Sequence, residues 1–146
     1  MKQEFSAGGI VIKKQNGSVY ILMAQHAEHH GWGFPKGHIG DIHVGESKED
    51  TAIREVKEET GIDAEIISYA IEESYNYTWK GQNRRKTVAY YFMRYISGNF
   101  AGKDHEMEAV EWVELDQVES RLSYTNAKEM FRELRPQLEK IAQSEK

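Results

Sequence analysis

Three glutamates at helical spacing are the residues of this sequence best suited to chemistry. Glu55, Glu58 and Glu59 stand at positions i, i+3 and i+4, so a helix would bring their carboxylates to one face. Like charges on one helix face repel each other, and a bound cation would remove that cost. Mg²⁺ takes carboxylate oxygens as ligands, so the spacing fits a magnesium site. A solvated acidic helix face is the alternative interpretation of the spacing alone.

The segment around these glutamates carries helix start and stop signals. Ser47 is a suitable N-cap, and Asp50 follows three residues later, as in a capping box. Gly61 is placed as the C-cap of the same helix. The predicted buried stripe of this helix consists of Ala52, Ile53, Val56 and Thr60.

The sequence before the helix predicts a hairpin and a loop. The apolar segments 5–12 and 19–24 flank an Asn16-Gly17 turn signal, which is typical of an antiparallel hairpin. Segment 31–45 is rich in glycine and carries Pro35, so we expect a loop there.

The sequence after the helix predicts long strands and a second helix. Segments 62–79 and 87–96 read as strands joined by a turn that contains Gly81-Gln82-Asn83. In 87–96 both alternating sets of residues are largely apolar, which predicts a strand covered on both faces. A short strand is expected at 109–113, and an amphipathic helix at 126–142 that Pro136 should kink or divide. Strands with helices on two sides indicate an α/β (α+β) fold with α-β-α layers.

Composition narrows the class of protein. With 24 acidic against 19 basic residues the formal charge is −5, which argues against a general nucleic-acid binder. The absence of cysteine excludes a thiolate zinc site and a cysteine nucleophile. No apolar run is long enough to span a membrane, and the first residues lack a signal peptide. We therefore expect one cytoplasmic domain over 1–146, with no membrane partner.

The glutamates belong to a longer pattern that resembles a known family. Gly40, Glu46 and the run Arg54–Ile62, REVKEETGI, match the Nudix box of the Nudix hydrolase superfamily in every fixed position. The flanking segments SAGGI, WGFPKGH and KTVAYYFMRY look like the asymmetrical bis(5'-nucleosyl)-tetraphosphatases. The resemblance implies a Nudix fold, an α-β-α sandwich around a mixed curved sheet. It also implies a Mg²⁺-dependent pyrophosphohydrolase that cleaves diadenosine tetraphosphate to ATP and AMP by water attack on phosphorus.

The loop before the box departs from the family pattern. Eight residues separate Gly37 of Pro35-Lys36-Gly37-His38 from Glu46, where relatives have five. We expect Gly37, rather than Gly40, to be the equivalent of the family glycine that contacts the metal. The loop would then carry three additional residues.

The resemblance also implies roles for the box residues. Glu55, Glu58 and Glu59 would be the metal ligands, with Mn²⁺ as a possible substitute for Mg²⁺. Arg54 would hold Glu46 or Glu58 in place as an ion pair behind the metal ligands. The general base would be one of three glutamates, and clustered carboxylates titrate as a set, so the choice stays open between Glu58, Glu59 and Glu106.

Substrate contacts are expected outside the box. Lys36, His38 and Lys86 would meet phosphate oxygens of a nucleotide substrate. Tyr77 and Tyr124 are the candidates for stacking on adenine, although Tyr77 shares a strand face with other aromatic residues and such faces are most often core. The remaining histidines, His26, His29, His30, His43 and His105, lack zinc spacing, and most of them are expected to be exposed.

Three other functions remain open on the sequence alone. They are removal of oxidised or non-standard nucleoside triphosphates, trimming of RNA 5' ends, and nucleotide sensing by a catalytically silent Nudix module. The flanking segments argue against the first two, and the complete set of box carboxylates argues against the third. The preferred nucleotide, the number of metal ions and the choice between monomer and homodimer are not fixed by the sequence.

Overall fold

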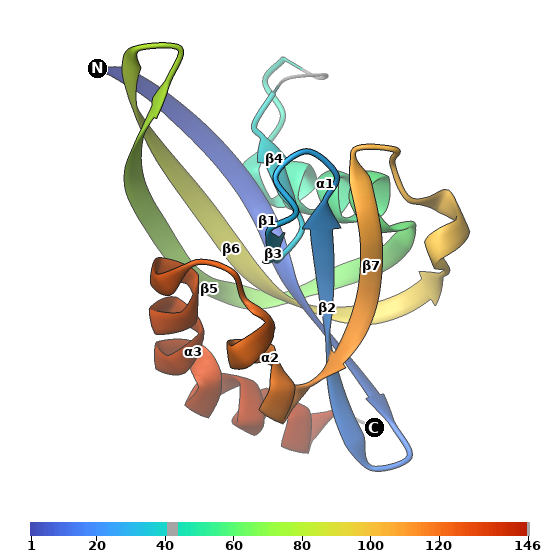
Figure 1. The fold of residues 1–146 in the computed structure, drawn as a ribbon. Coiled ribbons are helices and arrows are strands. Elements are labelled where there is room, and N and C mark those ends of the chain that lie inside the picture. Colours follow the sequence, from blue (N-terminus) through green and yellow to red (C-terminus); the bar gives the residue numbers. More distant parts are fainter. Residues whose placement is uncertain (41–43, 146) are drawn as a thin grey trace.

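One mixed sheet lies between two helical layers (Figure 1). The computed structural model describes residues 1–40 and 44–145. In chain order the elements are β1 (Lys2–Gln15), β2 (Ser18–His26), β3 (Trp32–Gly33), β4 (Lys36–His38), α1 (Lys48–Thr60), β5 (Ile62–Trp79), β6 (Gln82–Gly98), η1 (Phe100–Gly102), β7 (Met107–Glu114), α2 (Leu115–Arg121) and α3 (Thr125–Ser144).

The sheet is mixed. Its main path runs β3-β2-β1-β6-β5, while β4 pairs with β1 and β7 pairs with β2. Strands β1 and β6 are parallel, and the other neighbours are antiparallel. The long β5–β6 hairpin bends so that its turn lies near the N-terminus (Figure 1). This parallel pairing sets Glu4 of β1 opposite Lys86 of β6.

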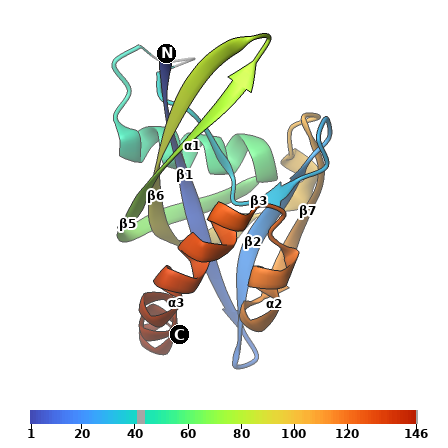
Figure 2. The same ribbon diagram turned by 60° about the vertical axis from the view of Figure 1, so that its left-hand side comes forward.

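Helix α1 covers one face of the sheet, and α2 and α3 cover the other (Figures 1 and 2). The core has two halves, because alternate residues of a strand point to opposite faces. Ile10 and Phe92 pack with Phe131 of α3, whereas Val11 and Met93 pack with α1 on the other side. The α-β-α layering expected from the sequence is confirmed.

The predicted covering of β6 on both faces is also confirmed. Val88, Tyr90 and Phe92 belong to the core beneath α3, and Ala89, Tyr91 and Met93 belong to the core beneath α1. The predicted first hairpin forms as well, with Asn16 and Gly17 at positive φ (51° and 80°), as a tight two-residue turn requires.

Helix α1 begins and ends where its caps predict. Ser47 Oγ accepts a hydrogen bond from the N–H of Asp50 at 3.0 Å, and Gly61 adopts the left-handed conformation at φ 81°. A Cβ at Gly61 would lie 2.1 Å from the carbonyl oxygen of Asn99, so only glycine fits there. The buried stripe includes Thr51 and Glu55. It excludes Ile53, which is 37% exposed.

Two other predictions about elements are wrong in part. The 31–45 loop contains β3 and β4, which pair with β2 and β1. The turn between β5 and β6 consists of Lys80 and Gly81, while Gln82 and Asn83 already pair with β5. Arg84, Arg85 and Lys86 therefore lie within β6.

Helix α3 continues through Pro136 and is not divided there. Proline removes one backbone hydrogen bond, but the apolar residues on both sides of it, Phe131, Leu134, Leu138 and Ala142, are buried against the sheet. Burial of an amphipathic face supplies most helix stability in proteins, so the helix survives the loss. No helix in the described part of the chain has the length and hydropathy that a membrane crossing requires.

Candidate functional site

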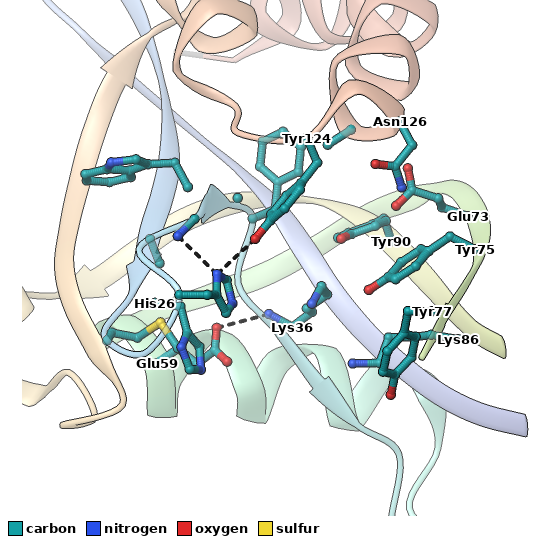
Figure 3. Close-up of a pocket in the computed structure, with 18 residues that line it drawn as sticks. His26, Lys36, Glu59, Glu73, Tyr75, Tyr77, Lys86, Tyr90, Tyr124 and Asn126 are labelled. Atoms are coloured by element: carbon teal, nitrogen blue, oxygen red, sulfur yellow. Dashed lines mark hydrogen bonds between the residues drawn. The ribbon is translucent and has the colours of Figure 1, made fainter. Parts of the chain in front are cut away.

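A cavity of about 510 Å³ opens beside α1, β6 and the start of α3 (Figure 3). Its wall includes residues from β2, β3, β5 and β6 and the helix ends that face them. The residues predicted from the sequence that line it are Lys36, Glu59, Tyr77, Lys86 and Tyr124. Segments far apart in the chain thus meet in one site of the size that binds small molecules.

Arg54 gathers the box carboxylates at the edge of this cavity. Its Nε and Nη2 each donate to Glu46 at 2.8 Å, which is a bidentate pair. Its Nη1 donates to Glu55 and to Glu58, both at 3.1 Å. The ion pairs expected with Glu46 and Glu58 are both present, and Glu46 also accepts from Thr51 Oγ1 at 2.7 Å. Because Arg54 and Glu46 are largely buried (13% and 7% exposed), the pairing fixes how α1 presents its acids.

Gly37 of β4 lies against the Glu55 carboxylate. A Cβ at Gly37 would lie 1.3 Å from Glu55 Oε2 and 2.0 Å from its Cδ, so no side chain fits there. Gly40 instead occupies a turn after β4, with φ 73°. This geometry supports Gly37 as the glycine that belongs with the helix acids. Residues 41–43 of the predicted loop extension, His43 included, lie outside the described residues.

Burial raises the pKa of two of the helix acids. The pKa of Glu55 rises to about 8, because the carboxyl is buried and Glu58 and Glu59 lie close, although Arg54 opposes the shift. The pKa of Glu59 rises to about 7, again mainly by burial, while the charge and the backbone N–H of Lys36 oppose the shift. That N–H donates to Glu59 Oε1 at 3.2 Å. Both carboxylates would therefore be stabilised by a cation placed between them.

The acids fit a hard divalent cation by their chemistry. Glu55, Glu58 and Glu59 offer carboxylate oxygens from one helix, and the backbone of Gly37 lies against the carboxylate of Glu55. Within the described residues no three His, Asp or Glu side chains are already gathered around one point. The reason is visible in the contacts, since Arg54 occupies Glu55 and Glu58 while Glu59 turns to Lys36. Binding a cation would require these side chains to turn toward one another.

Two lysines form the cationic part of the cavity wall. Lys36 comes from β4 and Lys86 from β6, and both line the cavity, Lys36 beside Glu59 and Lys86 beside Tyr77 (Figure 3). Burial lowers the pKa of Lys86 to about 8, and the charge of Lys36 adds to this effect. An anion between the two lysines would relieve their repulsion, so this part of the cavity suits a phosphate group.

The two predicted stacking residues both line the cavity but differ in setting. The hydroxyl of Tyr77 donates to Glu4, which also pairs with Arg84. Tyr124, at the N-cap of α3, is 48% exposed, and its hydroxyl lies 2.9 Å from His29 Nδ1. Tyr124 is thus about half exposed, while the hydroxyl of Tyr77 is held by Glu4 of β1.

His38 and Glu106 are described residues that do not line the cavity. His38 is exposed at the end of β4, and its carbonyl accepts from Arg54 at 3.4 Å. Glu106 is an exposed loop residue before β7, close enough for its charge to contribute to the raised pKa of Glu59. The loop is tied to the end of α1, because the N–H of Asp104 donates to the carbonyl of Glu58 at 2.9 Å.

Several lining residues were not predicted. His26 and His29 stack at 4.4 Å and line the cavity; His29 is exposed, as expected, whereas His26 is half-buried. Glu73 and Tyr75 line it from β5, and Asn126 from α3. The signal for Glu73 and Tyr75 was present, since they continue the alternation that ends at Tyr77. The approach of the two histidines to Tyr124 depends on tertiary structure that no local pattern reveals.

Comparison of the sequence with known proteins identifies a family and several relatives. A model of the NUDIX domain matches residues 3–134. The chain is 37% identical over 134 residues to MutT4 of Mycobacterium tuberculosis, which covers 87% of this chain and 52% of MutT4. It therefore spans about half the length of that relative. It is 28% identical over 113 residues to the asymmetrical bis(5'-nucleosyl)-tetraphosphatase of Caenorhabditis elegans, covering 76% of this chain and 79% of that protein.

A solved structure agrees with the architecture. The crystal structure of a binary complex of the C. elegans Ap4A hydrolase matches with a TM-score of 0.71 and 25% identity. The match covers 92% of this chain and 97% of that one. The fold class expected from the sequence, helices on both faces of a mixed sheet, is shared between the two.

Proposed function

The chain belongs to the NUDIX domain family, and from this premise we propose that it is a pyrophosphohydrolase that uses a divalent cation. We propose further that it cleaves a dinucleoside polyphosphate, with diadenosine tetraphosphate giving ATP and AMP. One observation carries the proposal: a single cavity joins an acid of α1, Glu59, to two lysines and to tyrosines. A polyphosphate that carries a base needs an acid to hold its cation, positive charges for its phosphates and aromatic rings for its base.

The phosphate chain is proposed to lie along Lys36 and Lys86. Lys86 is half-buried and its pKa is lowered, so binding a phosphate would strengthen its positive charge and orient the chain toward α1. Tyr124, about half exposed, would hold a base at the other end, where stacking contributes about 1–3 kcal/mol. His38, outside the cavity, would have no direct part in binding the substrate held there.

The helix acids are proposed to hold the cation, Mg²⁺ in the first place. Glu55, Glu58 and Glu59 would be its carboxylate ligands and the carbonyl of Gly37 an additional one. When bound, the cation would neutralise charge on the phosphate oxygens during transfer to water. Arg54 holds Glu46, Glu55 and Glu58, and its role would be to orient them rather than to contact substrate.

Glu59 is the best placed of the three candidates for the general base. It lines the cavity beside Lys36, whose backbone N–H donates to Glu59 Oε1. Glu58 pairs with Arg54, and Glu106 lies outside the cavity. Glu59 would accept the proton of the attacking water, and Glu106 would contribute its charge from the neighbouring loop.

A MutT-like activity on oxidised or non-standard nucleoside triphosphates is the second candidate. The higher identity to MutT4 favours it, and the same acids and lysines would serve. The likeness to the C. elegans tetraphosphatase in both sequence and fold favours the first. Both candidates use the same site and differ in the groups attached to the reacting phosphate.

Comparison of kcat/KM values separates the two candidates. Diadenosine tetraphosphate and oxidised dGTP would each be incubated with the chain and Mg²⁺, and products would be resolved by chromatography. The proposal predicts at least about tenfold higher kcat/KM for diadenosine tetraphosphate. A preference of that size for oxidised dGTP would replace it by the MutT-like function, and no hydrolysis of either would contradict both.

A further inference from the structure

Glu73 is a buried acid of the cavity wall that the proposed chemistry does not use. It lies on β5, far from the acids of α1 in the sequence, and lines the cavity. Its Oε2 is buried and has no hydrogen-bond partner among the residues that the structure describes. Burial also raises the pKa of Glu73. A buried polar atom without a partner is rare in proteins and calls for a specific explanation.

The position of Glu73 relates it to the phosphate end of the cavity. In the β5–β6 pairing Tyr75 lies opposite Lys86, and Glu73 lies two pairs further along, opposite Val88. Glu73, Tyr75 and Tyr77 therefore point to the same face of the sheet. Two residues of a strand span roughly 7 Å, which is the scale of a nucleoside. A nucleotide with its phosphate at Lys86 would carry its base to Glu73.

The neighbours of Glu73 suit a base. Figure 3 shows Asn126 of α3 beside Glu73 and the rings of Tyr75 and Tyr90 nearby, while Lys36 and Glu59 lie toward α1. The charged contacts for phosphate and the flat apolar contacts for a ring are thus at different parts of one cavity. Its volume of about 510 Å³ is in the range of small-molecule sites.

We propose that Glu73 determines base specificity by accepting a hydrogen bond from the exocyclic amino group of a purine. This inference rests on the proposed function, because it assumes that a nucleotide occupies the cavity. An ionised carboxylate is an acceptor only, so it pairs with an amino group and leaves a base edge without a donor unpaired. The site would therefore take an amino-bearing purine, as in adenosine or guanosine nucleotides. The buried Oε2 would gain its missing partner from the ligand.

Two probes that differ only in the amino group test this inference. ATP and purine riboside 5'-triphosphate would be titrated by calorimetry into the wild-type chain and into Glu73→Leu and Glu73→Gln. Glu72→Leu is the matched control, since Glu72 is the neighbouring exposed acid of β5 and does not line the cavity. Far-UV circular dichroism would verify that each variant is folded.

The expected results reflect a hydrogen bond to a charged acceptor. Wild type and Glu72→Leu should bind ATP about 10–100-fold more tightly than the purine analogue. Glu73→Leu should bring the two Kd values together by weakening ATP alone. Glu73→Gln keeps an acceptor oxygen without the charge, so it should retain a preference of a few-fold.

Two results would overturn the inference: equal Kd values for the two probes in the wild type, or an unchanged ratio in Glu73→Leu. Hydrolysis of diadenosine tetraphosphate, measured in parallel, separates this failure from failure of the proposed function. A wild-type chain that cleaves the dinucleotide without amino-group discrimination would remove only the role of Glu73. A chain that discriminates but cleaves nothing would keep that role and remove the proposed function.

Discussion

Replacing Gly37 by alanine should disable the site through one steric contact. The added Cβ would lie 1.3 Å from Glu55 Oε2, whereas ordinary contact begins at 3.4 Å. The Glu55 carboxylate must therefore move by about 2 Å, away from its 3.1 Å pairing with Arg54. A misplacement of about 1 Å in a catalytic constellation costs on the order of 100-fold. We expect kcat to fall at least 100-fold, with about 1–3 kcal/mol lost from the free energy of unfolding through overpacking.

Steady-state hydrolysis of diadenosine tetraphosphate with Mg²⁺ measures the effect of Gly37→Ala, and thermal unfolding measures its effect on stability. Gly102→Ala is the control, because a Cβ there would meet its nearest neighbour, the Cα of Gly61, at 3.4 Å. That variant should keep wild-type kcat. A Gly37→Ala variant that retains kcat within about threefold of the wild type would refute the assignment of Gly37 to the acids of α1.

Three further predictions address a helix acid, the stacking of the adenine base and the pH dependence of stability. Glu58→Gln should lower kcat by several orders of magnitude with an unchanged circular dichroism spectrum, and near-normal turnover would contradict the metal-ligand assignment. Tyr124→Ala should raise KM for diadenosine tetraphosphate by about 5–100-fold with a smaller change in kcat, and an unchanged KM would exclude stacking. Without metal, the pKa values of Glu55 (about 8) and Glu59 (about 7) exceed their ordinary value of 4.5. The folded state therefore binds more protons than the unfolded state between these pH values. Its Tm should therefore fall as pH rises from about 4.5 to 8, and Mg²⁺ should raise Tm more at pH 8 than at pH 6; equal Mg²⁺ effects at both pH values would contradict this linkage.

Local signals predicted the helix of the site well. Ser47 and Gly61 delimit α1 because caps depend on a few neighbouring residues. The ion pairs of Arg54 join residues within nine positions of one another. The strand at 62–79 was predicted at its observed bounds. These features are encoded within single segments, so one sequence suffices to find them.

The remaining site depends on contacts between distant segments. His29 reaches Tyr124 across 95 positions, and Asn126 of α3 meets Glu73 of β5 only once α3 is docked. Pro136 predicts a kink or a division of α3, and the helix is not divided, because its burial against the sheet outweighs the lost hydrogen bond. Tertiary packing thus determines both the approach of distant site residues and the continuity of α3, and local sequence patterns do not contain this information.

Hydrolysis of diadenosine tetraphosphate in ¹⁸O-labelled water tests the proposed reaction most directly. The reaction would be run with Mg²⁺ and with EDTA, and the products would be identified by chromatography and mass spectrometry. We predict equal amounts of ATP and AMP, one ¹⁸O atom in one of the two products, and no turnover in EDTA. Two molecules of ADP, unlabelled products or turnover in EDTA would contradict the proposed reaction.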